Sequence, residues 1–428
     1  MPRLGVEREL IGEWEGLLYV GYILGFGWLT GLLQGYLVRI RLTKPTEAAL
    51  FSRLAIVGVA VFSGLLLAIA AGFHTPLFRL LRLGDAPTGW WYFFLFLLTQ
   101  WPGLFFEQVL TVRGKALPLM IFGGLSAIGF VLALLLPLYH GAGLAHALFI
   151  LAIFAAVKGL VILAWVAVDH LRKPPPNERS EHPRAAAYQS TKAAGRLSIY
   201  QSTLSRWLSV SWPLITYATV GALVTAFDPW FVNYWYEGDE SIFATFRYGA
   251  RELPLLAAIT NGAMVVVLPR LTEDTSAGLD LLKASSRRLF HWIFGGAIFL
   301  MVTSPWWWTV VFTELFADSL PLFQAYLFVV VSRLLFPVPV LTALGHTRLL
   351  MAFGFLELVI NVVLSILLAP YFGLMGIIWA TVIAYLVDKL CLMAYLKYRT
   401  GIASARYTDY RWLGAYVGVL VLAYFLVR

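Results

Sequence analysis

Basic residues inside apolar segments are the positions at which this sequence could do chemistry. An ionised side chain in hydrocarbon costs about 3 kcal/mol or more unless a partner or a cavity accepts it. Lys158 lies in the apolar run AIFAAVKGLVIL, and Arg247 and Arg251 stand four residues apart, a spacing that predicts one helix face. Arg333 lies in a further apolar segment. Because ammonium and guanidinium groups bind phosphate oxygens, these four cations are predicted ligands of an anionic substrate.

Polar and acidic residues in other apolar runs are candidates for coupling transport to a cation. Glu357 and Asn361 are four residues apart, and the spacing predicts a shared helix face near mid-membrane. Asp228 lies near the end of another run. Structural roles remain open: Glu357 and Asn361 could form an inter-helix hydrogen bond that fixes packing. Asp228 could form a buried ion pair with Arg247, and Arg333 could bond a neighbouring backbone group.

Catalytic motifs do not accompany these charges. The sequence contains no Walker loop, no HExxH and no GxSxG, and its seven histidines are scattered singly. The single Cys391 excludes an internal disulfide and a cysteine-rich metal site. The sequence therefore predicts a transporter and not an enzyme, with no cofactor and no bound metal.

The composition indicates a membrane protein. Of the 428 residues, 60% are apolar and only 13% are charged, with a mean hydropathy of +0.78, whereas soluble domains are roughly half apolar and about a quarter charged. This excludes a soluble enzyme, a disordered chain and a disulfide scaffold. In a membrane protein a net charge of +9 reflects Lys and Arg in cytoplasmic loops, so no nucleic acid partner is expected. The apolar runs predict twelve transmembrane helices, at 14–40, 50–72, 89–112, 115–139, 144–171, 206–231, 241–269, 284–304, 318–343, 348–369, 373–396 and 411–427.

The basic residues are distributed unevenly between the two ends of these helices. Twenty-two of the 32 Lys and Arg fall on the side that includes the polar stretch 172–205, five fall on the other side, and five lie inside helices. Cytoplasmic loops collect Lys and Arg. We therefore expect a multi-pass protein of a prokaryotic plasma membrane, with 172–205 as a cytoplasmic linker and both termini outside.

An internal repeat runs through the chain. PLMIFGGL at 118–125 matches LLMAFGFL at 349–356 in five of eight positions, and three further pairs of segments align at offsets of 231 or 232. Corresponding helices have the same orientation, which predicts two parallel-repeat helix bundles around a central cavity. By the same offset, the partner of helix 206–231 would precede Met1, so the first helix of the N-terminal bundle is expected to be missing.

The repeat predicts the domain organisation. A bundle of five helices is followed by the linker, by a bundle of six helices and by one extra transmembrane helix. The predicted limits are 1–171, 172–205, 206–398 and 399–428.

Three stretches of the chain contain charges, glycines or prolines in an order that is also found in a known protein family. Residues 227–273 place Asp228 late in one helix, then the segment Tyr248-Gly-Ala-Arg251, then Pro269. Residues 341–390 hold Gly345 with a basic residue nearby, then Asn361 ahead of an apolar run, then Gly373 and Gly376. Residues 12–39 have the pattern of the loop after a first helix, followed by a second helix. In these features the chain resembles the polysaccharide and O-antigen flippases of the multidrug/oligosaccharidyl-lipid/polysaccharide (MOP) exporter superfamily.

The resemblance implies a function and a set of partners. It implies movement of a polyprenyl-diphosphate-linked oligosaccharide to the outer leaflet by alternating access, for O-antigen or lipopolysaccharide biosynthesis. The expected partners are the lipid-linked oligosaccharide, membrane lipids, a proton or sodium ion, and other polysaccharide assembly proteins. A cation-coupled multidrug exporter of the same superfamily is the alternative, and it would line its cavity with acids. A membrane-embedded glycan ligase or transferase is a third, and it would need a large external loop.

Overall fold

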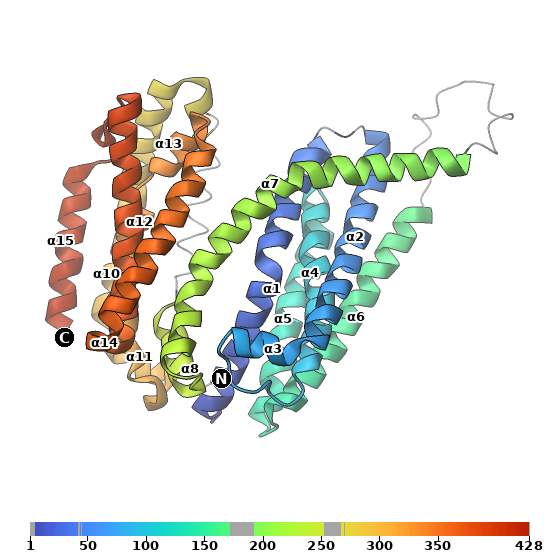
Figure 1. The fold of residues 1–428 in the computed structure, drawn as a ribbon, viewed down its shortest axis with the longest axis horizontal. Helices are drawn as coiled ribbons and strands as arrows, with labels where there is room; N and C mark the ends of the chain where they lie inside the picture. Colours follow the sequence, from blue (N-terminus) through green and yellow to red (C-terminus); the bar gives the residue numbers. More distant parts are fainter. Residues whose placement is uncertain are drawn as a thin grey trace. The chain divides into compact units, whose positions relative to one another are not determined.

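The computed structural model describes residues 5–41, 43, 45–171, 192–251, 267–268 and 270–427. Every regular element in those ranges is a helix (Figure 1), which confirms the predicted all-α class. Ten helical segments in the same ranges are long and apolar enough to cross a membrane. The chain divides into two compact units: unit 1 comprises Gly16–Ala222, and unit 2 comprises Pro2–Glu15 and Leu223–Arg428.

Unit 1 is built around α4 (Trp90–Val112), which packs against α2, α5 and α6 (Figure 1). The buried face of α4 carries large aromatic side chains, among them Phe93, Trp101 and Phe105, each at most 4% exposed. Burial of such rings supplies most of the packing energy between helices. The other helices of this unit are α1 (Arg8–Arg41) from Gly16 onward, α2 (Pro45–Gly72), α3 (His74–Leu80), α5 (Ala116–Tyr139), α6 (Leu144–Leu171) and the first part of α7 (Lys192–Trp235).

Within unit 1, α1 packs at close range against α7 through a row of glycines. A Cβ placed on Gly31 would lie 2.4 Å from the Cα of Ile215, closer than a side chain allows. Gly27 and Gly35, one helical turn to either side, meet α7 in the same way. Small residues at four-residue spacing let two membrane helices approach closely, so this row sets the distance between α1 and α7.

Unit 2 is built around α14 (Thr347–Tyr395), which contacts α11, α12 and α13. In the same unit α8 packs against α11, and α15 packs against α10. The bounds of these elements are α8 (Glu240–Gly249), α10 (Thr275–Phe312), the 3-10 turn η3 (Glu314–Phe316), α11 (Ser319–Tyr326), α12 (Val329–Arg333), α13 (Pro337–Ala343), the π-turn η4 (Leu396–Thr400), the 3-10 turn η5 (Ser404–Arg406) and α15 (Tyr410–Val427).

The long helix α14 is two helices joined at Gly373. The backbone of Gly373 has φ 57° and ψ −136°, a conformation outside the helical region that glycine adopts readily. The apolar segment Leu349–Thr400 has 52 residues, and as one helix it would extend about 78 Å, more than twice the thickness of a hydrocarbon core. The break at Gly373 divides it into two spans, at the place where helices 348–369 and 373–396 were predicted to meet.

Two other predicted helices differ from the observed ones. The segment 318–343 is broken into α11, α12 and α13, and α13 begins at Pro337, because proline fits the first helical turn but not the interior. The predicted helix 241–269 is described only as α8, which ends at Gly249, and residues 252–266 lie outside the described ranges. Gly249 brings the end of α8 against α11, since a Cβ there would lie 2.5 Å from Leu322 Cβ.

The predicted linker 172–205 is described only from Lys192, where α7 begins. The boundary between the two units lies further along α7, after Ala222. The predicted domain limits, the repeat correspondence and the missing first helix stay predictions.

The glycine row predicts a specific sensitivity to added volume. Gly31→Leu should destabilise the protein by roughly 1–3 kcal/mol, because the new side chain collides with the α7 backbone, and the melting temperature in detergent should fall. Gly124→Leu is the matched control, since Gly124 lies on an exposed face of α5 with nothing within 4 Å of its Cβ position. Equal melting temperatures for the two variants would contradict close packing of α1 on α7.

Candidate functional site

The carboxylate of Asp228 is buried in unit 2 between α7 and both halves of α14. Its Oδ1 accepts a hydrogen bond from Asn361 Nδ2 at 2.7 Å, and its Oδ2 accepts one from the Thr381 hydroxyl at 2.6 Å. All three residues are at most 9% exposed. The break at Gly373 turns α14 back on itself, so residues from both halves reach one carboxylate. Both donors are neutral, and therefore the charge of Asp228 is solvated but not neutralised by them.

Oxygen atoms converge around Asp228. The amide oxygen of Asn361 lies 3.5 Å from the hydroxyl oxygens of Thr381 and Ser365. Thr381 Oγ1 also lies 3.1 Å from the backbone oxygen of Ile377. Carboxylate, amide, hydroxyl and carbonyl oxygens are the ligand types that hard cations take. One carboxylate among neutral oxygens suits a cation of single charge. Within the described ranges there is no group of three or more His, Cys, Asp or Glu side chains that could hold a metal ion.

Glu357 belongs to a different cluster from Asn361, although the two lie one helical turn apart in α14. The Glu357 side chain interacts electrostatically with Lys389, Asp388 and Arg333. Lys389 Nζ lies 2.6 Å from Asp388 Oδ2, and the Asp388 side chain is also hydrogen-bonded to Glu357. The predicted coupling pair Glu357 and Asn361 is therefore divided between two polar clusters of unit 2.

Arg247 forms an ion pair with Glu15 inside unit 2. Arg247 Nε lies 3.1 Å from Glu15 Oε2, and the two side chains are 31% and 5% exposed. The alternative in which Arg247 pairs with Asp228 is wrong, because each has another partner. Arg247 remains a predicted substrate ligand, since a guanidinium has five N–H donors and this contact uses one.

Arg251 and Arg333 lie in surroundings that the sequence did not indicate. Arg251 follows the end of α8 and is exposed, so it does not share a helix face with Arg247 as the four-residue spacing predicted. Arg333 ends α12, and its guanidinium carbon lies 4.8 Å from the centre of the Tyr385 ring. That distance is typical of a cation–π interaction.

Lys158 lines a cavity of about 660 Å³ inside unit 1. The residue is 6% exposed, and its Nζ donates a hydrogen bond to Gln100 Oε1 at 2.8 Å. Nζ also lies 5.4 Å from the centre of the Phe122 ring. The side chain crosses α4 at Gly103, where a Cβ would lie 2.7 Å from Lys158 Cε. These two contacts of the ammonium are with a neutral amide and a ring.

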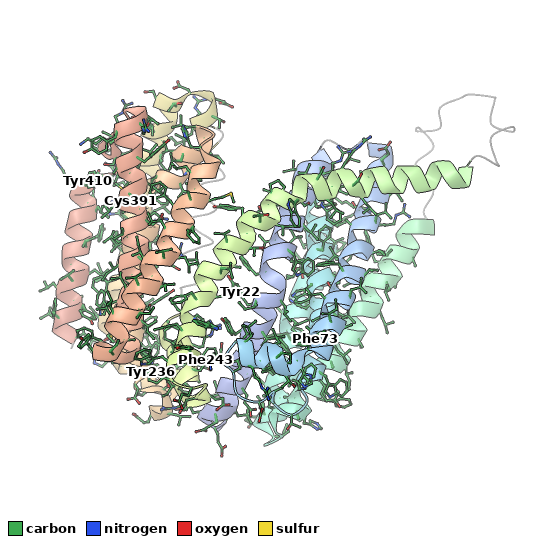
Figure 2. The ribbon with its side chains drawn as sticks, viewed as in Figure 1. Tyr22, Phe73, Tyr236, Phe243, Cys391 and Tyr410 are labelled. Carbon is green, nitrogen blue, oxygen red and sulfur yellow. The ribbon has the colours of Figure 1, made fainter. Side chains whose placement is uncertain are left out.

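The cavity walls come from α1, α4, α5 and α6 and are largely apolar. Six of the twenty lining residues are aromatic, among them Tyr22 of α1 (Figure 2) and Trp101 of α4. One acid, Glu107 of α4, lines the same cavity and interacts electrostatically with Lys158. An apolar cavity with a few convergent polar groups is the usual form of a ligand site.

Several residues of these sites were not singled out in the sequence. Gln100 and Gly103 precede Glu107 on α4 by seven and four residues. This spacing would have predicted that the three residues share one face of the helix. Thr381 stands eight residues after Gly373, and only the turn in α14 brings it to Asp228. Glu15 lies in the first turns of a predicted helix, where an acid is unremarkable, and nothing local indicates its partner.

The ten long apolar helices of the described ranges indicate a multi-pass membrane protein. No family model matches the sequence, and no curated protein matches it either. Among solved structures the chain is similar to the lipid II flippase MurJ in an inward closed conformation, with 14% identity and a TM-score of 0.61 over all of this chain and 95% of that one.

A second solved structure has a similar fold. It is an inward-facing multidrug resistance transporter of the MATE family of the MOP superfamily, with 15% identity and a TM-score of 0.59 over 92% of this chain and 90% of that one. At these identities the likeness shows the fold alone. The chain has the fold of MOP-superfamily transporters, which confirms the predicted resemblance at that level.

The ion pair predicts how unit 2 responds to substitution. Arg247→Met should destabilise the protein by about 2 kcal/mol, because it leaves the buried Glu15 carboxylate without its charged partner. Adding Glu15→Leu should recover much of that loss, measured as melting temperature in detergent. Arg270→Met is the control, since Arg270 pairs with Glu273 at an exposed site and should change stability by less than about 1 kcal/mol. Strictly additive effects of the two substitutions would contradict the pair.

Proposed function

We propose that this protein is a cation-coupled flippase. Its cargo is a polyprenyl-diphosphate-linked oligosaccharide, which it moves from the cytoplasmic to the outer leaflet of a prokaryotic plasma membrane by alternating access. The product serves cell-surface polysaccharide biosynthesis. The MOP-superfamily fold and the similarity to a structure described as a lipid II flippase support this class of transporter.

The observation that carries the proposed cargo is the Lys158 ammonium in the unit 1 cavity, which is hydrogen-bonded to a neutral amide and shares the cavity with one acid, Glu107. A diphosphate brings at least two negative charges that must be kept from hydrocarbon. An ammonium has three N–H donors, and the hydrogen bond to Gln100 uses one of them. The remaining donors are suited to phosphate oxygens, and a charge-assisted hydrogen bond in a low-dielectric cavity is stronger than a neutral one.

Asp228 supports coupling to a cation. A carboxylate that is held by two neutral donors and surrounded by further oxygens gains most from a proton or a sodium ion, because either one neutralises it. Its two hydrogen-bond donors come from opposite sides of the Gly373 break. We infer that occupancy by the cation changes how tightly α7 and the two halves of α14 are held together, which would link the cation to the conformation.

Export of cationic drugs is a second candidate function. Glu107 and the aromatic walls of the unit 1 cavity favour it, since aromatic faces and a carboxylate attract organic cations. The two candidates assign opposite roles to the two charges of one cavity. Under the flippase proposal Lys158 binds the cargo, whereas under the drug-export alternative Glu107 binds it.

Charge-neutral variants distinguish the two functions. In reconstituted vesicles Lys158→Gln should slow translocation of a polyprenyl-diphosphate oligosaccharide by roughly 10- to 100-fold, because one charge-assisted hydrogen bond is lost. Glu107→Gln should slow it far less. Lys115→Gln is the matched control, since Lys115 is exposed at the start of α5. Loss of transport of a lipophilic cationic dye in Glu107→Gln, with normal translocation in Lys158→Gln, would support drug export and contradict the flippase proposal.

Cation binding is tested separately on the Asp228 site. Sodium or a fall in pH should raise the melting temperature of the wild-type protein, and Asp228→Asn should abolish that rise because the neutral amide no longer attracts a cation. Thr381→Val should weaken the effect by removing one oxygen. Glu273→Gln, in the exposed pair with Arg270, is the control and should keep the response. A full response in Asp228→Asn would contradict the proposed coupling site.

A further inference from the structure

A basic surface in unit 2 is formed by α10, by η5 and α15, which pack against α10, and by the turn η4 at the end of α14. The segments 280–291 and 396–411 contain seven basic residues and only two acids, Asp280 and Asp409. The charge distribution of the sequence predicts that this end of the helices is cytoplasmic. The basic residues are Lys283, Arg287, Arg288, Lys397, Arg399, Arg406 and Arg411.

The loop before α15 is fixed against α10 by hydrogen bonds. Lys283 Nζ donates to the Ala405 backbone oxygen at 2.7 Å, and Ser286 Oγ donates to the Tyr407 backbone oxygen at 3.3 Å. Tyr407 is fully buried, and burial raises the pKa of its hydroxyl, so it stays neutral. Arg406 donates to Ser276 Oγ at 3.1 Å. Two of the seven cations thus hold the loop in place.

Further along, α10 and α15 are joined by aromatic contacts. The His291 ring lies 4.7 Å from the Trp412 ring, and its Nδ1 is hydrogen-bonded to the Tyr416 hydroxyl at 2.7 Å. Arg287 and Arg288 lie one helical turn before His291. They are therefore level with the first turn of α15, and both are exposed.

The start of α15 adds a cation and a ring to this surface. Arg411 is exposed, and Tyr410 beside it (Figure 2) is 46% exposed. Within the described ranges none of Arg287, Arg288 and Arg411 forms an ion pair with an acid, although basic side chains elsewhere in unit 2 do. Three guanidinium groups thus face outward from two helices that are locked together.

Exposed aromatic residues lie on the same elements: Trp292 is four residues after Arg288 on α10, and Trp412 follows Arg411 on α15. Trp292 is 79% exposed, Tyr398 is 80% exposed and Trp412 is 43% exposed. Tryptophan and tyrosine gather at the level of lipid head groups, with basic residues beside them. A partner protein or a nucleic acid would leave Trp292 unexplained, because this residue lies on the part of α10 that continues into the apolar span. The combination of guanidinium groups with interfacial rings fits a phosphate at the membrane surface.

We propose that Arg287, Arg288 and Arg411 bind the phosphate of an anionic phospholipid, with Trp292 and Trp412 against its glycerol and acyl region. The lipid bridges α10 and α15 at the membrane surface. This site is separate from the cargo cavity of unit 1, and it does not depend on the proposed transport function.

Lipid retention tests the site directly. Protein purified from membranes that contain phosphatidylglycerol and phosphatidylcholine should retain phosphatidylglycerol selectively, measured as lipid adducts by native mass spectrometry. The triple variant Arg287→Gln/Arg288→Gln/Arg411→Gln should lose that adduct, at about fivefold in affinity for each charge removed. Arg79→Gln/Lys115→Gln/Arg206→Gln removes the same charge from exposed positions of unit 1 and should retain it. All substitutions are at exposed positions, and an unchanged elution profile verifies folding.

Competition identifies the chemistry of the ligand. Soluble glycerol phosphate should not displace the lipid, because the rings contribute to binding. Displacement by glycerol phosphate at equal concentration would show a free-phosphate site and overturn the lipid proposal. Retention of phosphatidylglycerol by the triple variant, or equal loss in the control variant, would overturn it too.

Discussion

The buried carboxylate of Asp228 is the interaction on which the arrangement of unit 2 depends. A carboxylate inside a membrane-spanning segment is tolerated only where donors or cations reach it. Here the donors come from Asn361 and Thr381, which lie 20 residues apart in α14. They meet at one point because α14 turns back at Gly373, in a conformation that a residue with a Cβ would resist. One charge thus connects three helical segments.

The same constraint separates the intramembrane charges into two groups. Arg247 forms an ion pair with Glu15, and Lys389 forms one with Asp388. The hydrogen-bond partners of Lys158 and Asp228 are neutral, although Lys158 also interacts electrostatically with Glu107 of the same cavity. A charge in an ion pair is already balanced by its partner. A buried charge whose hydrogen-bond partners are neutral attracts an ion of opposite sign more strongly than it would in water. This difference is the physical reason for proposing an anionic cargo at Lys158 and a cation at Asp228.

Hydropathy and charge predicted most of the helices, because long apolar segments specify spans with little help from tertiary contacts. The boundary beside Gly373 was predicted for the same local reason, whereas 318–343 was predicted as one helix and is interrupted before Pro337. The partners of the charged side chains could not be predicted from the sequence. Lys158 is hydrogen-bonded to Gln100 on another helix, and Arg247 is hydrogen-bonded to Glu15, more than 230 positions earlier in the chain. The four-residue spacing of Arg247 and Arg251 was misleading, because α8 ends at Gly249 against α11. Such pairings depend on packing that no local pattern encodes.

The central claim is that this chain moves an anionic lipid-linked cargo in response to a cation. The most direct measurement uses wild-type protein reconstituted in vesicles, with a fluorescent polyprenyl-diphosphate oligosaccharide on one leaflet and an imposed sodium or proton gradient. The account predicts translocation that depends on the protein and changes rate when the gradient is reversed, while the uncharged polyprenyl alcohol with the same glycan is not moved faster than in empty vesicles. Equal movement of the charged and uncharged lipids, or a rate that ignores both gradients, would contradict the account.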